Sequence, residues 1–453
     1  MRNRSLVLFL LAGTPVLPLC AQDTQDSQAV LLKILQRLDA LEQENKQLVQ
    51  EVHDLKQTVA ASQPQAAATQ TQTQNASTEE RLAVDENRIE EQAQTKVEAS
   101  QKFPISLSGM LLFNAFRSTP TSIDTGNESY SSLLSGPSTS GATLRQTIIG
   151  LQFQGPSLPG GGQVHGSLAM DFGTGFPEDS NWLRLREGTL SFDWPNRSFS
   201  VGQDKPLISP YEPDSLAEVA IPPLAGAGNL WLWLPQARYE ERLHFGADSG
   251  LNIQAAMMET DERYDNAYAY VQEFEPVRPA AEGRIAFWHK FDDQRKIEIG
   301  AGVHASTTHV AYTSANSRIA ALDWRIIPWS HLQLTGTVYH GQNVAGLGAI
   351  GNGVSIFPDG TVRAVHTWGG WSQVAFPITR RLTFNIFSGI EDDRASDLLV
   401  GSITRNWSYA GNLVYHLGPN VVVSAEALQM RLLLLSGLPE IRNNYDLAFG
   451  YLF

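Results

Sequence analysis

The end of the chain, Tyr445 to Phe453, carries a large apolar or aromatic side chain at every second position. The sequence is YDLAFGYLF, and the positions between hold the small or polar residues Asp446, Ala448 and Gly450. A period of two residues predicts a strand whose side chains alternate between two faces. Chain ends are usually polar and frayed. This one predicts a strand with hydrocarbon on one side and water on the other.

The chain has 453 residues, of which 42% are hydrophobic, so it can form a large ordered domain with an appendage. It carries 33 Lys and Arg against 47 Asp and Glu, a formal net charge of -14. This balance argues against a general nucleic-acid binder.

Residues 1–21 are typical of an export signal peptide. Arg2 and Arg4 form a basic start, and an apolar stretch follows over residues 6–19. A membrane-spanning helix is the alternative, but the stretch is short and interrupted by proline. The one cysteine, Cys20, falls inside the signal, so the mature chain is expected to use no disulfides.

Residues 29–60 repeat apolar side chains every seven positions, which predicts an α-helical coiled coil in the periplasm. Asn45 falls at a core position, where a buried polar residue fixes register and oligomer number. The alternative is a single amphipathic helix packed on its own domain. The predicted oligomerisation positions are Leu31, Ile34, Leu38, Leu41, Asn45, Leu48, Val52 and Leu55.

Residues 61–102 are interpreted as a linker with a second, short helix. Its first part is rich in Ala, Gln and Thr and cannot bury a core. The character of the sequence changes at Phe103, and we place the start of the main domain there.

From residue 103 to the end, segments of about ten residues alternate between apolar and polar or small side chains, as in a transmembrane β-barrel. Lys296 to Ser306 is a clear example, with Ile297, Ile299 and Val303 on one face. A soluble sandwich also alternates, so the connections must decide between the two. They are alternately short and long: GPSLPGGG, DWPNR, FGADSG, FDDQR, PWS, PITR and LGPN are short, and 118–142, 204–229, 260–279, 342–363 and 432–442 are long.

Short turns on one side and long loops on the other predict an outer-membrane barrel of about 16 antiparallel strands. An even number places both ends of residues 103–453 in the periplasm, on the side of the coiled coil. The predicted fold class is therefore an all-β transmembrane barrel with an N-terminal α-helical coiled coil.

The chain resembles trimeric Gram-negative outer-membrane porins, and more specifically the DcaP-like family. The resemblance extends over the whole barrel and lies in LRQTIIGLQFQGP (144–156), VHGSLAMDFGTG (164–175), LRLREGTLSF (183–192), FSVGQDKPLISP (199–210), AGNLWLWLPQARYE (227–240) and YHGQNVAGLG (339–348). It implies a homotrimer and passive diffusion of small hydrophilic, often anionic solutes. One departure is LWLWLPQ, where the family pattern would carry an arginine before Pro-Gln.

The resemblance also implies roles for two parts of the chain. Phe449, Tyr451 and Phe453 resemble the signal by which the barrel-assembly machinery recognises such proteins. In sixteen-stranded porins the third long loop narrows the pore, and here that loop is Asp204 to Asn229.

Opposed rows of acidic and basic side chains across a narrow pore would create a transverse field that sorts ions. The acidic candidates in the loop are Asp204, Glu212, Asp214 and Glu218; the basic candidates on the polar faces of strands are Arg184, Arg186, Arg238, Arg242, Arg284, Arg325 and Arg381. The alternative is that the arginines only pair with lumen carboxylates such as Glu240, Glu282, Asp323 and Glu391.

The sequence contains no HExxH, GxSxG or Walker motif, and GLGAIG (346–351) has no helix after it to bind a phosphate. We therefore expect no enzyme activity, no cofactor and no metal site. The acids of residues 259–275 could hold divalent cations near lipopolysaccharide, but a solvated loop is the simpler interpretation.

The sequence favours an outer-membrane porin for anionic or dipolar solutes, in contact with lipid and lipopolysaccharide. A structural tether or adhesin that acts through its coiled coil, for example on peptidoglycan, is the alternative. An outer-membrane lipase is a weaker one.

Overall fold

The computed structural model describes residues 105–119, 138–174, 182–260, 275–276, 279–310, 313–350 and 353–453. The predicted signal peptide, coiled coil and linker lie outside these residues. Among the described residues, no helix is long and apolar enough to cross a membrane.

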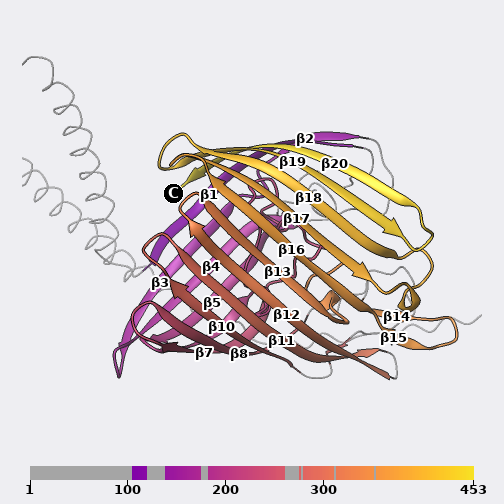
Figure 1. Cartoon of the computed structure of the whole chain (residues 1–453), viewed down its shortest axis with the longest axis horizontal. Helices are drawn as coiled ribbons and strands as arrows, with labels where there is room; N and C mark the ends of the chain where they lie inside the picture. The colour runs from indigo at the N-terminus through magenta and orange to yellow at the C-terminus, as the bar shows by residue number, and fades with distance from the viewer. Residues whose placement is uncertain are drawn as a thin grey trace, which may run out of the picture. The chain divides into compact units, whose positions relative to one another are not determined.

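Almost every element of the described chain is a strand (Figure 1). The first ten are β1 (Ile105–Ser118), β2 (Thr139–Thr143), β3 (Ile148–Leu158), β4 (Gly162–Thr174), β5 (Trp182–Trp194), β6 (Arg197–Asp204), β7 (Leu234–His244), β8 (Ser249–Met258), β9 (Glu275–Pro276) and β10 (Ala280–Lys290). The others are β11 (Lys296–Val310), β12 (Thr313–Trp329), β13 (Leu332–Gln342), β14 (Val354–Ile356), β15 (Val362–Ala364), β16 (His366–Pro377), β17 (Leu382–Asp393), β18 (Ile403–His416), β19 (Val421–Leu434) and β20 (Pro439–Leu452), with two 3₁₀ turns, η1 (Ala345–Leu347) and η2 (Ala395–Asp397).

The sheet closes on itself as a 16-strand antiparallel barrel. β20 pairs with β1 along the seam, where Phe449 lies opposite Phe113. β2 and β3 pair with successive halves of β1 and together form one interrupted strand. β9 pairs with β11 beyond the end of β10, and β14 and β15 form a separate hairpin in a loop. The predicted antiparallel barrel and its strand number are confirmed, whereas the predicted coiled coil lies outside the described residues.

The faces of the strands are inverted relative to a soluble protein. On β20, Tyr445, Leu447, Phe449 and Tyr451 are exposed, whereas the alternate polar residues such as Asp446 are buried. β11 repeats the pattern, with Val303 60% exposed and His304 2% exposed. Apolar side chains cover the outside of the barrel, so this outer face fits the hydrocarbon interior of a membrane.

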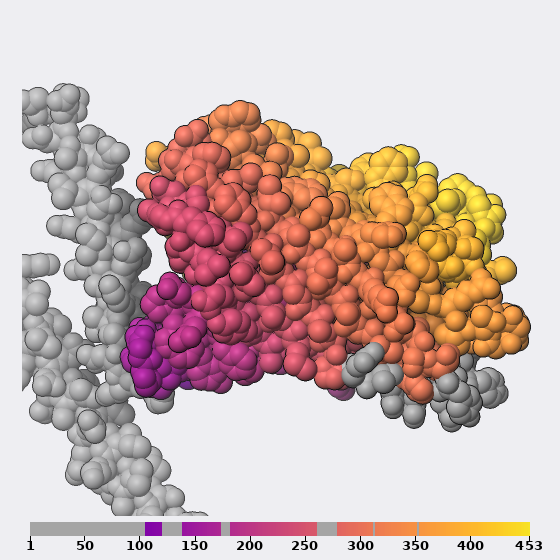
Figure 2. Space-filling view, turned by 60° about the horizontal axis from the view of Figure 1, so that its bottom comes forward, coloured from indigo at the N-terminus to yellow at the C-terminus, as the bar shows by residue number. Residues whose placement is uncertain are grey.

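Aromatic side chains mark the two ends of the apolar band. On β16, Trp368 and Phe376 both point outward, and residues this far apart on one strand are separated by about 27 Å along it. With the tilt of barrel strands this corresponds to a height of about 20 Å, somewhat less than the apolar band of about 25 Å in such barrels. Figure 2 shows part of this outer wall as a continuous surface, coloured pink to orange.

The connections divide between the two ends of the barrel as predicted. β14 and β15 lie at one end, at the right of Figure 1, and the carboxy terminus lies at the other. Two boundaries were predicted wrongly. The segment 432–442 is a hairpin, because β19 continues to Leu434 and β20 begins at Pro439. The third loop extends to residue 233, because the apolar residues 230–233 lie outside any strand, with Leu230 and Trp233 buried.

The inverted faces predict how a charge on the outer wall affects stability. Ala425 lies on the exposed face within β19, and Val421 lies on the same face at its turn end. We expect Ala425→Arg to lower the free energy of unfolding in lipid vesicles by about 2–4 kcal/mol, and Val421→Arg by about 0–1 kcal/mol, because the penalty depends on depth in the bilayer. Denaturant titration followed by tryptophan fluorescence measures both. Equal losses for the two variants would contradict a membrane-spanning wall.

Candidate functional site

The third loop, residues 205–233, lies within the barrel, where side chains of the inner wall hold it. The backbone N–H of Leu207 donates to Glu282 Oε2 on β10 at 2.6 Å. The N–H of Asp214 donates to Gln373 Oε1 on β16 at 2.6 Å. The Ser215 hydroxyl donates to Glu426 on β19 at 2.6 Å. These anchors follow one another around the wall.

The next residues of the loop are held by strands at the start of the barrel. Asn114 Nδ2 on β1 donates to the carbonyl oxygen of Leu216 at 2.8 Å, and Gln146 Nε2 donates to that of Ala217 at 2.6 Å. Arg184 on β5 donates to the carbonyl oxygen of Ala220. Farther on, Asn406 Nδ2 on β18 donates to Gly226 at 2.9 Å. Since these strands are spread around the barrel, the loop crosses its interior.

Apolar contacts hold the same loop against the wall. Leu224 and Ala227 pack with Trp371, Phe387 and Met430 on the inner faces of β16, β17 and β19. A second cluster joins the loop residues Leu207, Ile208 and Leu230 to Leu347, which belongs to the connection between β13 and β16. The buried apolar residues therefore lie between loops and wall.

Two glycines on the inner wall leave room for the loop backbone. A Cβ atom added at Gly389 on β17 would overlap the carbonyl oxygen of Ala227. One added at Gly302 on β11 would lie 2.9 Å from Cγ2 of Ile208. Any larger residue at these positions would displace the loop.

The basic side chains of β5 share one carboxylate. Arg184 forms an ion pair with Asp171 on β4 at 2.7 Å, and Arg186 lies 3.6 Å from the same residue. Both guanidinium groups lie over the ring of Trp233, at 5.3 Å and 4.5 Å from its centroid. The Trp233 indole N–H donates to Glu187 at 3.0 Å. This group of residues couples the end of the loop to the wall.

Further ion pairs lie on β7 and at the start of the loop. Arg238 pairs with Asp204 at 3.1 Å, and Lys205 with Glu212 at 2.8 Å. Arg242 pairs with its neighbour Glu240 at 2.6 Å, beside the turn between β5 and β6. All these groups are partly exposed to the lumen, so opposite charges alternate along this side of the wall.

Arg284 on β10 is the most buried of the paired arginines. It lies 2.6 Å from Asp323 and 3.1 Å from Glu298, and it is 4% exposed. Its Nη1 also donates to Gln254 at 3.0 Å. Tyr211 of the loop hydrogen bonds to the same Glu298, and burial, reinforced by that carboxylate, raises the pKa of its phenol. The phenol therefore remains a neutral donor, which links the loop to β11.

The predicted constriction residues divide into four groups, the last of which is Arg381 alone. Arg184, Arg186, Arg238, Arg242 and Arg284 lie in ion pairs with carboxylates, most of them on the wall itself, as the alternative interpretation of the sequence described. Asp204, Glu212 and Asp214 contact wall or loop partners, and Glu218 is buried. Arg325 lies on β12 with its Nε buried.

Arg381 does not lie on the polar face of a strand, contrary to the prediction. It occupies the exposed turn before β17, because the alternating pattern begins only at Leu382. Glu282 and Glu391 also differ from expectation: Glu282 contacts His304 at 2.9 Å, and Glu391 accepts from Tyr339 at 3.0 Å.

Sequence reasoning missed Gln146 and Asn412 as contacts of the loop. It also missed Lys205 and Trp233 within the loop, and Asp171 as the partner of Arg184 and Arg186. Asp171 lies on the polar face of β4, and the alternating pattern of that strand could have identified it. The others are recognisable only once the loop is placed. Within the described part of the chain, no cluster of His, Cys, Asp and Glu could hold a metal ion.

No protein-family model and no curated protein matches the chain. Solved structures do match. The outer membrane channel DcaP of Acinetobacter baumannii superposes with a TM-score of 0.64 at 15% identity, over 77% of this chain and 97% of that one. An anion-selective porin from Comamonas acidovorans gives 0.53 at 12% identity, over 78% and 100%. The porin OmpF of Salmonella typhi, in complex with daunomycin, gives 0.50 at 11% identity, over 77% and 97%.

The fold is thus that of the 16-strand outer-membrane porins. The DcaP structure, nearly all of which is matched, is consistent with the resemblance to DcaP-like porins noted in the sequence.

The buried ion pair of Arg284 predicts a contrast in stability. Arg284→Gln would leave Asp323, 1% exposed, without its cation, and we expect the free energy of unfolding to fall by about 3–5 kcal/mol. Arg242→Gln removes a partly exposed pair and should cost less than about 1 kcal/mol. Denaturant titration in vesicles measures both losses. A larger loss of unfolding free energy for Arg242→Gln than for Arg284→Gln would contradict this prediction.

Proposed function

We propose that this protein is an outer-membrane porin through which small hydrophilic solutes diffuse passively, and that residues 205–233 form its constriction. The observation that carries the proposal is the third loop, anchored across the interior of a barrel with an apolar exterior. A wall of one sheet separates water from lipid, and a loop inside it limits the size of what passes.

The arrangement of charge favours small dipolar or weakly anionic solutes over strongly charged cations. Positive and negative groups lie next to each other along the wall, as in Arg238 with Asp204 and Lys205 with Glu212. Neighbouring opposite charges cancel at long range and leave a local field, which acts on dipoles more than on net charge. On β5, Arg184 and Arg186 share Asp171, and Glu187 lies beside them, so positive and negative groups are close together in this sector too.

We further propose a homotrimer, in line with the resemblance to trimeric porins. The predicted coiled coil would stabilise it from the periplasm. A role as a tether or adhesin has no support among the described residues.

Selective labelling tests the constriction. The chain has one cysteine, Cys20, in the predicted signal, so a single introduced cysteine can be modified by itself. Asp214 in the loop is exposed to the lumen, and we expect a cationic thiol reagent to reduce the single-channel conductance of Asp214→Cys. Leu438→Cys, in the exposed turn between β19 and β20, is the matched control and should be unaffected. An unchanged current after labelling at position 214 would reject the constriction.

Reversal potentials in a KCl gradient test the selectivity. We expect the native channel to prefer chloride weakly. Asp171→Asn keeps the shape of the side chain but leaves Arg184 and Arg186 uncompensated, so it should shift the potential further towards chloride. Asp292→Asn, in the exposed turn between β10 and β11, alters the net charge equally outside the lumen and should change nothing. A strong cation preference of the native channel would contradict the proposal.

A further inference from the structure

A hollow in the outer wall lies near the loop end of β11, β12, β13 and β16. Its volume is about 490 Å³, in the range of ligand pockets. Val303, Ala305, Arg318, Ala320 and His340 line it, and all five are exposed on the outside of the barrel. The hollow therefore faces the surroundings of the barrel and is separate from the lumen. We call it the outer trough.

Small side chains create the outer trough. Ala305 on β11 lies opposite Arg318 on β12, and Ala320 lies opposite His340 on β13. Ala305 and Ala320 leave a depression where larger outward residues would fill the space. Val303 lines the hollow as well, and the exposed Leu322 follows Ala320 on the same outer face of β12. Ala305, Ala320 and Val303 therefore give the hollow an apolar part.

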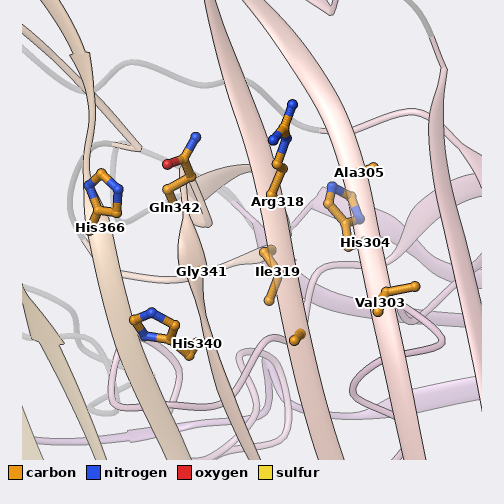
Figure 3. Close-up of a pocket in the computed structure, with 10 residues that line it drawn as sticks. Val303, His304, Ala305, Arg318, Ile319, His340, Gly341, Gln342 and His366 are labelled. Atoms are coloured by element: carbon orange, nitrogen blue, oxygen red, sulfur yellow. The ribbon is translucent and has the colours of Figure 1, made fainter.

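Basic and polar groups form the rim of the outer trough at its loop end. Figure 3 shows Arg318, Gln342 and His366 in this order on neighbouring strands. His366 contacts Asp397 at 2.8 Å. Across the described chain, Arg318 forms no ion pair with a carboxylate, although it is on the exposed face of β12. The rim therefore presents a free guanidinium at the loop end of an apolar wall.

The basic rim continues along the outside of the next strands. Arg405 pairs with Asp392 at 2.5 Å. Arg431 receives no carboxylate in the described chain; it donates to the neutral Gln429 at 2.8 Å and lies 5.6 Å from the ring centre of Trp407. A guanidinium on the lipid face is unfavourable unless it lies at the interface or meets an anion. The arrangement fits anionic head groups at the rim with apolar chains below them.

We propose that the outer trough binds lipid A, the phosphorylated lipid part of lipopolysaccharide, with a phosphate at Arg318 and an acyl chain along Val303 and Ala320. Phosphate offers a planar guanidinium two parallel charge-assisted hydrogen bonds. The proposal requires that the barrel span the outer membrane with its loops outward, but it does not depend on solute diffusion. A failure here would leave the channel function untouched.

Native mass spectrometry of the purified full-length protein in detergent tests the proposal. The probes are diphosphoryl lipid A, monophosphoryl lipid A, phosphatidylglycerol and inorganic phosphate. We expect diphosphoryl lipid A to bind most tightly and Arg318→Gln to weaken it about tenfold, which is about 1.4 kcal/mol. Arg318→Lys keeps the charge and should retain most of the affinity.

Arg197→Gln is the matched control, because Arg197 is exposed at the opposite, turn end of the barrel. The affinity of this variant for lipid A should equal that of the native protein. Resistance of the unheated barrel to SDS confirms that each variant is folded. Equal binding of all phospholipids with no effect of Arg318→Gln would overturn the proposal. So would loss of the oligomer with unchanged lipid binding, which would identify the trough as a contact between protomers. Binding of inorganic phosphate alone would also reject it.

Discussion

Hydrogen bonding of the backbone in hydrocarbon is the constraint on which this structure depends. No water is available there, so every strand must pair on both edges, and a sheet can do this only by closing. The pairing of β20 with β1 completes the ring, and it brings Phe449 opposite Phe113 from the two ends of the domain. The alternation of side chains follows, because each strand then has one face to lipid and one to the lumen.

A barrel of this width cannot fill its interior with wall side chains alone. The third loop and the connection after β13 enter that space and pack on each other, with Leu230 of one and Leu347 of the other in a shared cluster. Their backbone groups then need partners, which the wall supplies through Glu282, Gln373 and Asn406. The apolar contacts set the general position of the loop, and these polar anchors set its register against the wall.

Charges inside the barrel act mainly in pairs. Arg284 with Asp323 is buried, and such a pair is sensitive to the loss of either member. The pairs nearer the lumen, such as Arg238 with Asp204, are more exposed and contribute less to stability. In the proposed porin, these are the charges that solutes would meet. On the outer face of β12, Arg318 has no carboxylate partner among the described residues, and it lies towards the loop end, where the membrane becomes polar.

The sequence by itself determined the barrel. The two-residue period that ends at Phe453 and the alternation of short and long connections depend only on neighbouring residues, so the strands and the outward faces were readable from them. Where the local pattern became uniform, as in LWLWL and RLLLL, boundaries were misplaced. Only the tertiary structure decided the site. Asn114 and Asp446 share a hydrogen bond, and Asp214 meets Gln373 and Asn412, although these residues are far apart in the chain. Closure of the ring brings them together, and no local pattern encodes which lumen side chains will then lie opposite one another.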